Sequence, residues 1–324
     1  MPEPASPLRS RHLITGDGVI GRATADALRR AGQDVTLASR SAPPPGDQGI
    51  PHLELDALDG AALHAAARGA SHLYLTLGLA YRAAAWEHDW PRVMQHAIDA
   101  ALAHGAGLVW FDNVYVYGPR PLQVPMREDH PIDPPSRKGK VRARLLAMLQ
   151  EAGARRGLRW LIARSADFYG PHVRLSILYS AAIERQLQGR AAFWLGDPDA
   201  RHSFTCTPDA GRALARLALD DGAWQQSWHL PTASPPPTPR ELLLESARLL
   251  GAPTRVQRLP VALVRAMGLA LPLLREVGEM LYQNQQDYVF SSAKFMARYP
   301  DFRVTPYAEG LAAMVSSLRP IARP

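Results

Sequence analysis

The sequence contains very little cysteine: Cys206 is the only one in 324 residues. A single cysteine cannot form an intramolecular disulfide or a thiolate metal site, and such usage suits a reducing cytoplasm. The eleven histidines show neither an H-x-x-x-H nor an H-E-x-x-H spacing, which are the spacings that place two metal ligands on one helix face. We therefore expect a cytoplasmic protein without a metal site.

Long apolar runs are also missing. The first ten residues, Met1–Ser10, are polar and lack the apolar centre of a signal peptide. The most apolar later segment, Val261–Leu274, is interrupted by Arg265 and Pro272. It is also shorter than the roughly 20 residues that a membrane-spanning helix needs. The sequence therefore predicts a protein with no membrane partner.

The charge is unbalanced but not concentrated in one place. There are 37 Lys and Arg residues against 30 Asp and Glu, which gives a net charge of +7 and a pI of about 9.8. The arginines are spread along the chain, and no basic run alternates with aromatic residues as in nucleic-acid-binding surfaces. We expect no nucleic-acid partner, and we interpret the excess charge as a generally basic surface that can attract an anionic cofactor.

The first half of the chain does contain a regular alternation of short apolar runs and helical patterns. This order predicts a parallel sheet covered on both faces, and right-handed crossovers make the sheet doubly wound. The expected strands are His12–Thr15, Asp34–Ala38, Pro51–Leu55, Ser71–Leu77, Gly107–Phe111 and Leu158–Ala163, and the expected helices are Val19–Ala31, Ala61–Ala67, Trp90–His104 and Val141–Ala154. We therefore predict the α/β fold class, with a first domain over residues 8–172.

After about Pro171, helical patterns outnumber short strands. The expected helices are Leu175–Gln188, Asp209–Leu219, Pro239–Leu250, Val261–Gln283 and Thr305–Leu318, and short strands are expected near Phe193, Phe204 and His229. We expect a smaller, mostly helical lobe over residues 173–324 that caps the carboxyl edge of the sheet. Some of its segments should return to the sheet, and its pocket should bind a small-molecule substrate.

The first predicted strand runs directly into a glycine-rich turn, Gly16-Asp17-Gly18-Val19-Ile20-Gly21. This G-x-G-x-x-G pattern lies between a strand and a helix, which is the context of a Rossmann dinucleotide site. The first glycine permits the turn, the second lets the backbone approach the pyrophosphate, and the third lets the helix pack closely. The pyrophosphate then lies on free N–H groups at the positive end of the helix. The residues assigned to this contact are Thr15, Gly16, Gly18, Val19, Ile20 and Gly21.

The second predicted strand ends at Ser39-Arg40, about 20 residues further on. An NAD site usually places an acid there to accept a hydrogen bond from the ribose 2′-hydroxyl. A guanidinium suits the 2′-phosphate of NADP instead. The sequence therefore favours NADP(H) over NAD(H), although Arg40 could also be a solvated loop residue.

Two further strand ends complete the expected cofactor contacts. Asp56 follows the third strand, where its side chain can bind the adenine amino group, and Ala57 follows it. Asp56 could equally cap the helix that begins near Asp59. At the end of the fourth strand, the expected contacts are Leu75, Thr76 and Leu77.

Four later segments resemble the extended short-chain dehydrogenase/reductases, a group that contains sugar-nucleotide epimerases, dehydratases and many carbonyl reductases. Val109–Gly118 resembles the family segment V-Y-x-S-S-x-x-V-Y-G, and Arg164–Pro171 resembles R-x-x-x-x-Y-G-P. Phe204–Ala213 and Trp228–Leu244 resemble later family segments in the same order. The resemblance thus implies a Rossmann fold and a nicotinamide cofactor, and we include Phe168 among the expected cofactor contacts.

The resemblance fails at the catalytic residues. The family uses a Ser or Thr, a Tyr and a Lys, which hydrogen-bond and protonate the substrate oxygen. The hydroxyl position holds Asn113 here. The Tyr-x-x-x-Lys position has two possible registers: Ser136 with Lys140, or Lys138 with Arg142. Neither register supplies the tyrosine.

Other residues would have to do the chemistry. Asn113 can donate to a carbonyl oxygen, and Lys140 could bind the ribose hydroxyls. Tyr115, beside Asn113, is the first candidate for the proton donor, and Tyr81 is the second. Packing explains either tyrosine equally well. The residues expected to contact the substrate are Tyr81, His172 and Tyr282.

Two functions fit these observations. The first is an NADP(H)-dependent oxidoreductase, or an epimerase/dehydratase-like enzyme, that acts on a carbonyl or alcohol with a non-standard active site. The second is a non-catalytic NADP(H)-binding sensor or regulatory protein, because the cofactor motif is intact while the catalytic residues are not. In either case we expect a homodimer.

Overall fold

The computed structural model describes residues 10–42 and 49–318. A parallel seven-stranded sheet forms its centre, in the order β10-β6-β5-β4-β1-β2-β3. Its strands are β1 (Arg11–Thr15), β2 (Asp34–Ser39), β3 (His52–Glu54), β4 (His72–Leu75), β5 (Gly107–Asn113), β6 (Trp160–Ser165) and β10 (Gln226–His229). The predicted α/β class with a doubly wound parallel sheet is confirmed.

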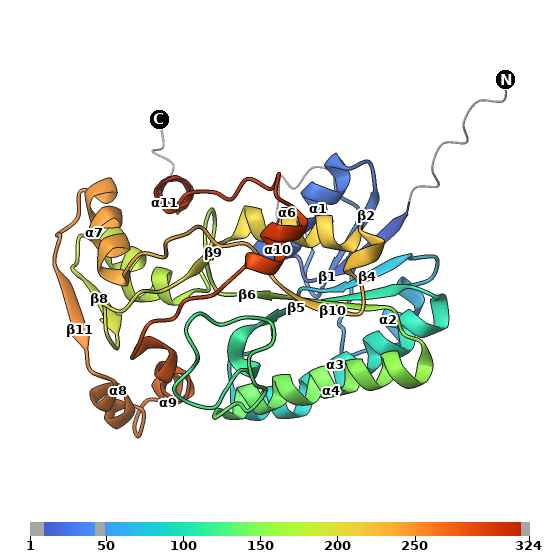
Figure 1. Cartoon of the computed structure of the whole chain (residues 1–324), viewed down its shortest axis with the longest axis horizontal. Helices are drawn as coiled ribbons and strands as arrows, with labels where there is room; N and C mark the ends of the chain where they lie inside the picture. Colours follow the sequence, from blue (N-terminus) through green and yellow to red (C-terminus); the bar gives the residue numbers. More distant parts are fainter. Residues whose placement is uncertain (1–9, 43–48, 319–324) are drawn as a thin grey trace.

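Helices cover both faces of this sheet (Figure 1). One face carries α1 (Val19–Arg30) packed against α6 (Thr207–Ala218), and the other carries α2 (Gly60–Ala66), α3 (Ala83–His104) and α4 (Arg137–Arg156). Two separate apolar cores fill the layers between helices and sheet. The central strands β1, β4, β5 and β6 are buried on both faces, which is why they appear in the sequence as largely apolar runs.

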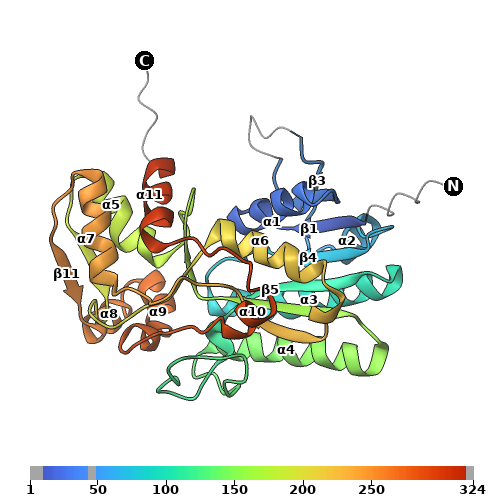
Figure 2. The ribbon, with the colours of Figure 1, turned by 45° about the horizontal axis from the view of Figure 1, so that its top comes forward.

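Most of the remaining elements gather beyond one end of the sheet, whereas α10 (Ala293–Arg298) packs against β10 (Figure 2). Two small parallel sheets in this part pair β7 with β9 and β8 with β11. These strands are β7 (Asp167–Tyr169), β8 (Ala192–Leu195), β9 (Phe204–Cys206) and β11 (Val256–Leu259). The helices are α5 (Glu184–Leu187), α7 (Pro239–Leu250), α8 (Val261–Met267), α9 (Pro272–Gly278), α10 (Ala293–Arg298) and α11 (Tyr307–Leu318). Short turns of other helix types are η1 (Val114–Val116), η2 (Tyr179–Ile183), η3 (Asp221–Ala223) and η4 (Leu281–Asn284).

Several predicted elements differ from the structure. The single helix expected over Val261–Gln283 is wrong: α8, α9 and η4 replace it, because Pro272 lacks the N–H that a continuing helix needs and begins α9 instead. The helix expected over Leu175–Gln188 is present over residues 177–187, where the π-helical stretch η2 runs directly into α5. The strands β7 and β11 were not predicted, since both are short and pair outside the main sheet.

The boundary between the two predicted domains at residue 172 stays a prediction, and residues 8 and 9 of the first lie outside the described part. The strand β10, from the second half, joins the main sheet beside β6. In the parts of the chain that the structure describes, no helix has the length and apolar character needed to cross a bilayer.

Candidate functional site

The glycine turn between β1 and α1 lies tightly against the end of β4. Gly16 has a φ of +108°, and a Cβ there would lie 2.6 Å from the backbone nitrogen of Leu77. A Cβ at Gly21 would collide with the Gly16 carbonyl oxygen. The Thr76 hydroxyl donates to the carbonyl oxygens of Thr15 and Gly16, at 3.0 Å each. Two of the three glycines are therefore required by packing alone.

Gly18 is different because packing does not explain it. A Cβ at this position would meet no atom within 4 Å. Gly18 is also the N-cap of α1, which has no side-chain cap and no acidic residue in its first turn. The first N–H groups of α1 are therefore left for an anion that would occupy the open space beside Gly18.

Val19 and Ile20 open the first turn of α1. The Ile20 side chain is buried in the core between α1 and the sheet, and Val19 packs partly against the same core. Their side chains hold the helix in place, so only their backbone N–H groups face the open space beside Gly18.

The end of β2 combines a hydroxyl with cationic groups. The Ser39 hydroxyl donates to the Ser41 carbonyl oxygen at 2.9 Å and lies 3.0 Å from Nε2 of His52. Arg40 is exposed, and within residues 10–42 and 49–318 no hydrogen bond or ion pair engages it. Its guanidinium is thus available for an anion.

A second charged group lies inside the glycine turn and was not predicted. The Asp17 carboxylate pairs with Arg22 at 3.3 Å and lies 3.8 Å from Nε2 of His52. Nε of Arg22 also donates to the Asp17 carbonyl oxygen at 2.7 Å. The Asp17 carboxylate therefore lies between the side chains of Arg22 and His52. Only the pairing of β2 with β3 brings His52 to this point.

At the end of β3 the structure separates two roles that the sequence left open. Asp59, not Asp56, caps α2 by accepting from the Ala62 N–H at 2.9 Å. Asp56 accepts one hydrogen bond from the Leu58 N–H at 3.0 Å and stays exposed. Ala57 is buried beside it. Asp56 therefore keeps a carboxylate oxygen for a ligand.

Helix α4 decides the register of the missing Tyr-x-x-x-Lys pair. Ser136 caps the helix by accepting from the Gly139 N–H at 3.0 Å. Lys138 and Arg142 lie one turn apart and are both buried, whereas Lys140 is exposed. Residues two apart on a helix point about 200° apart, so Lys140 cannot share the inward face with Lys138. The expected role of Lys140 at the cofactor ribose stays a prediction, while Lys138 and Arg142 occupy the inward positions of α4.

The Lys138 ammonium is enclosed by α9 and fully engaged. Nζ donates to Oε2 of Glu276 at 2.6 Å, to the Glu276 carbonyl oxygen at 3.1 Å and to Oε1 of Glu279 at 2.7 Å. It also lies 4.4 Å from the centre of the Tyr81 ring. Burial opposes ionisation of Glu276, but hydrogen bonds from Lys138 and the Ala83 N–H outweigh it and lower the pKa of that carboxyl.

Asn113, Tyr115 and Tyr81 come together, as their positions after neighbouring strands suggested. The Tyr81 and Tyr115 hydroxyl oxygens are 3.3 Å apart. Oδ1 of Asn113 accepts from the Tyr115 N–H at 3.0 Å, which starts η1 and leaves the amide nitrogen free of this turn. Burial raises the pKa of both tyrosines. Both hydroxyls therefore stay protonated at neutral pH, as hydrogen-bond donors.

Arg142, at the position of the family lysine, lies inside an aromatic cage. Its guanidinium carbon is 4.6, 4.3 and 5.6 Å from the ring centres of Trp86, Trp90 and Trp110. Its Nε lies 3.5 Å from the buried Asp112 carboxylate. Burial lowers the pKa of Arg142. These rings enclose the guanidinium, so Arg142 holds α3 and α4 to β5.

Of the remaining predicted residues, Tyr282 packs in the same core as Tyr81 and Tyr115, whereas His172 and Phe168 lie elsewhere. Tyr282 is buried in η4, with the guanidinium carbon of Arg120 5.6 Å from its ring centre. His172 has an exposed side chain and a φ of +61°, and its N–H donates to the Ser317 hydroxyl on α11. Phe168 lies half-buried in β7 and packs against the core of the second half. No contact in the described residues joins His172 or Phe168 to the Tyr81–Lys138 cluster.

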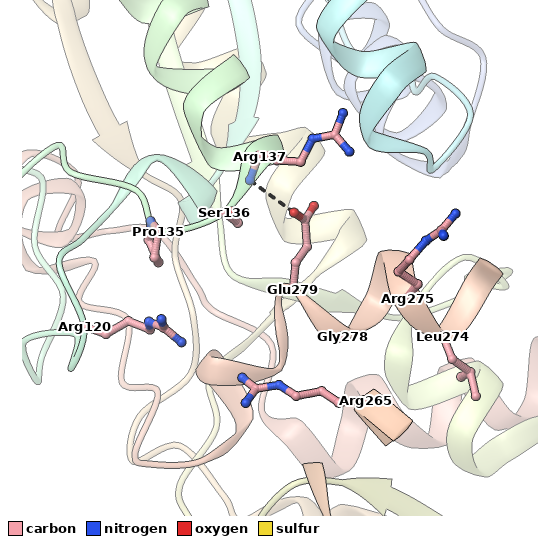
Figure 3. Close-up of a pocket in the computed structure, with 9 residues that line it drawn as sticks. All are labelled: Arg120, Pro135, Ser136, Arg137, Arg265, Leu274, Arg275, Gly278 and Glu279. Carbon is pink, nitrogen blue, oxygen red and sulfur yellow. Dashed lines mark hydrogen bonds between the residues drawn. The ribbon is translucent and has the colours of Figure 1, made fainter. Parts of the chain in front are cut away.

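A cavity of about 360 Å³ opens at the start of α4, next to Lys138 (Figure 3). The guanidinium groups of Arg120 and Arg265 point toward each other across it, and the Arg137 N–H donates to Glu279 on its wall. The cavity lining consists of Arg120, Pro135, Ser136, Arg137, Arg265, Leu274, Arg275, Gly278 and Glu279. This cavity, with four arginines in its lining, lies beside the N-terminus of α4, and no pattern in the sequence predicted it.

Comparisons with known proteins agree with this geometry. The model of a family described as the NAD dependent epimerase/dehydratase family matches residues 12–226. A comparison with curated proteins gave no match.

Among solved structures, the chain is similar to UDP-glucose 4-epimerase of Thermus thermophilus, solved in complex with NAD. The two share 20% identity and a TM-score of 0.75, over 95% of this chain and 99% of that one. A dTDP-glucose 4,6-dehydratase of Streptomyces venezuelae, solved with NAD bound, has 20% identity and a TM-score of 0.77, over 95% and 97%. UDP-glucose 4-epimerase of Thermotoga maritima, solved with UDP-glucose, has 16% identity and a TM-score of 0.77, over 95% and 98%.

At these identities the solved structures establish the fold, while the family model covers well over half of the chain. The matched region contains the glycine turn, the end of β2 and the whole inward face of α4. The expected resemblance to extended short-chain dehydrogenase/reductases is confirmed: the chain belongs to the NAD dependent epimerase/dehydratase family.

Proposed function

We propose that the protein is an NADP(H)-dependent oxidoreductase, or an epimerase/dehydratase-like enzyme, that acts on a carbonyl or alcohol group of a small molecule. The observation that best supports a dinucleotide cofactor is the open space at Gly18, beside an N-terminus of α1 that has no side-chain cap. Packing requires glycine at positions 16 and 21 but leaves position 18 open. A dinucleotide pyrophosphate fits that space and those N–H groups.

The preference for NADP(H) rests on the groups around Ser39. Arg40 has no partner among the described residues, and His52 lies next to Ser39. Asp17, the carboxylate that faces His52, is paired with Arg22. The Arg40 guanidinium can therefore give its charge to a ligand, which favours a 2′-phosphate over an unmodified hydroxyl.

The chemistry would use hydrogen-bond donors in place of the family set. Bound NADP(H) would supply a hydride to a substrate carbon or accept one from it. The Asn113 amide can donate to the substrate oxygen, and Tyr115 or Tyr81, each protonated at neutral pH, is placed to donate a proton to it. Lys138, with its three N–H groups engaged, would position Tyr81 rather than contact the substrate.

Arg40→Ala tests the cofactor assignment. We expect the dissociation constant for NADPH to rise about tenfold or more, since a charge-assisted contact is lost, while that for NADH changes little. Isothermal titration calorimetry measures both constants. Equal weakening of the two cofactors would show that Arg40 does not contact the 2′-phosphate.

Turnover tests the reaction. The purified protein is mixed with NADPH and a panel of aldehydes, ketones and nucleotide sugars, and the loss of NADPH absorbance is followed. Consumption that Tyr115→Phe reduces strongly and Tyr81→Phe reduces less would support Tyr115 as the donor. Tight NADPH binding without turnover would contradict the proposed enzymatic function and favour a second candidate function, which is binding without catalysis.

That second candidate is a non-catalytic NADP(H)-binding sensor or regulatory protein. The specific observation in its favour is the position of Lys138, which replaces the catalytic tyrosine and is held by two glutamates of α9. A cationic side chain whose protons all have acceptors within the protein has none left for a substrate oxygen.

The remaining expectations concern the whole protein. We propose a cytoplasmic protein that forms a homodimer, in keeping with its single buried cysteine. Light scattering of the purified chain tests the oligomeric state, and fractionation of the source cells tests the location.

A further inference from the structure

The segment from α8 to α9 exposes an unusual number of large apolar side chains. Ten such side chains are exposed in the described residues, and five of them lie between positions 263 and 273. Their exposed fractions are 47% for Leu263, 42% for Met267, 89% for Leu269, 48% for Leu271 and 66% for Leu273. Scattered exposed leucines need no explanation, but a concentrated group does.

The opposite side of the same segment is already used for packing. Val261 and Val264 of α8 are buried with Leu195 and Leu281, and Leu274 and Val277 of α9 pack against them. The two helices contact each other and form a hairpin with Gly268 to Leu271 at its tip. The exposed leucines are therefore not needed to anchor the hairpin, and they project from an element that is fixed from behind.

The charged residues that flank the exposed leucines in the sequence are positive, and the glutamates that follow, Glu276 and Glu279, are paired with Lys138. From Ser246 to Arg275 the sequence contains five arginines and no acidic residue. Arg255, Arg265 and Arg275 are exposed and form no ion pair in the described part of the chain. Exposed leucines flanked by unpaired arginines are the composition of a segment that lies in the interface of an anionic bilayer.

The hairpin is also placed where a flat surface can reach it. Figures 1 and 2 show α8 and α9 at the end of the molecule away from α1 and α2. The arginine-lined cavity borders the hairpin, because Arg265, Leu274 and Arg275 belong to both. Phosphate groups at a bilayer surface would therefore meet guanidinium groups as the leucines enter the apolar layer.

We propose that the α8–α9 hairpin docks the protein onto the surface of a membrane that contains anionic phospholipids. Leu269, Leu271 and Leu273 enter the interface, and Arg265 and Arg275 bind lipid phosphates. This differs from the expectation of no membrane partner. It agrees with the absence of a spanning helix in the described residues, because an interfacial hairpin does not cross the bilayer.

Vesicle co-sedimentation with the full-length protein tests the docking. Vesicles of phosphatidylglycerol and phosphatidylcholine in equal amounts are compared with vesicles of phosphatidylcholine alone. We expect binding to the anionic vesicles that decreases as salt is raised, and at least about tenfold weaker binding to the neutral ones. Equal or absent binding to both would overturn the proposal.

The variant Leu269→Glu with Leu273→Glu separates the hairpin from general basic charge. We expect it to lose at least about tenfold of the affinity for anionic vesicles. The matched control is Leu219→Glu, an exposed leucine at the end of α6, which should bind as the parent does. Unchanged binding by the double variant would overturn the proposal, and so would an equal loss in the control.

Two further measurements keep the result interpretable. Circular dichroism of both variants checks that they fold, as expected for exposed positions. Sedimentation velocity without lipid tests whether the hairpin instead joins two copies of the chain. A dimer that the double variant converts to monomer would assign the apolar surface to self-association and overturn membrane docking. NADPH binding is measured separately, since docking does not depend on the proposed enzymatic function.

Discussion

At the residue scale, glycine is required for different physical reasons at the three glycine positions of the turn between β1 and α1. Gly16 and Gly21 are imposed by contacts within the protein, at Leu77 and at the Gly16 carbonyl oxygen. Gly18 borders open space, and we propose that its lack of a side chain makes room for the cofactor pyrophosphate. Within these six residues, substitution of one glycine should therefore change stability and substitution of another should change cofactor binding. The two quantities can be measured separately.

Gly18→Ala should leave the free energy of unfolding nearly unchanged, because the new methyl group meets nothing and φ is −68°. It should raise the dissociation constant for NADPH by about tenfold or more, since the methyl group projects into the space proposed for the pyrophosphate. Calorimetry and chemical denaturation measure the two quantities. The matched change Gly21→Ala should lower the free energy of unfolding by roughly 1–3 kcal/mol. The reverse pattern would remove the distinction between the two glycines.

Lys138→Met should destabilise the fold by about 2 kcal/mol or more at pH 7, because two glutamates lose their shared cation. The pKa of Glu276 is lowered in the folded state, so its stabilising effect is present above about pH 4.5 and is lost as the pH falls through the folded pKa. The difference between variant and parent should therefore shrink in acid. Urea denaturation at several pH values measures it, and a difference independent of pH would contradict the assignment.

At the element scale, carboxylates of α9 contact the N-termini of two other helices. Glu276 accepts from the N–H of Ala83, the first residue of α3, and Glu279 accepts from that of Arg137, the first residue of α4. Acidic groups at helix N-termini are stabilising because the exposed N–H groups there carry partial positive charge. The segment that carries the proposed membrane hairpin is thereby tied to the position of the missing tyrosine.

Helix α2 offers a test at the same scale. Asp59→Ala should cost about 1 kcal/mol of unfolding free energy, because the cap to the Ala62 N–H is lost. Asp56→Ala should cost less in stability and should weaken NADPH, since its free carboxylate oxygen is proposed to bind adenine. Thermal denaturation and calorimetry compare the two. A larger stability loss for Asp56→Ala than for Asp59→Ala would show that the capping role of Asp59 is assigned wrongly.

At the scale of the whole molecule, the two halves of the chain meet at the candidate site. The glycine turn and α4 come from the first half, whereas Glu276, Glu279 and Arg265 come from the second. Binding of a ligand that requires the folded arrangement must stabilise the whole protein by mass action.

NADPH at a concentration of 100 times its dissociation constant should raise the free energy of unfolding by about 2.7 kcal/mol. Thermal denaturation with and without NADPH measures the shift in midpoint. NADH at the same concentration should produce a smaller shift, because its occupancy is lower. No shift with either cofactor would contradict the dinucleotide site.

The sequence by itself determined the fold class, the glycine turn and the family, because these depend on local patterns: apolar runs, glycine spacing and short motifs in order. It also located Asn113, Tyr115 and Tyr81, which follow neighbouring strands and so meet at one sheet edge. It left the register of α4 open, since the two readings differ only in which helix face points inward.

Only the tertiary structure decided that face, through the burial of Lys138 and Arg142 and the exposure of Lys140. The same holds for the partners of Lys138, which are about 140 residues away in the sequence, and for His52 beside Ser39. The sequence predicts one long helix over Val261–Gln283, and only the structure shows that this segment forms a hairpin of α8 and α9 with exposed leucines. Contacts between distant segments carry no local pattern, which is why packing alone could reveal them.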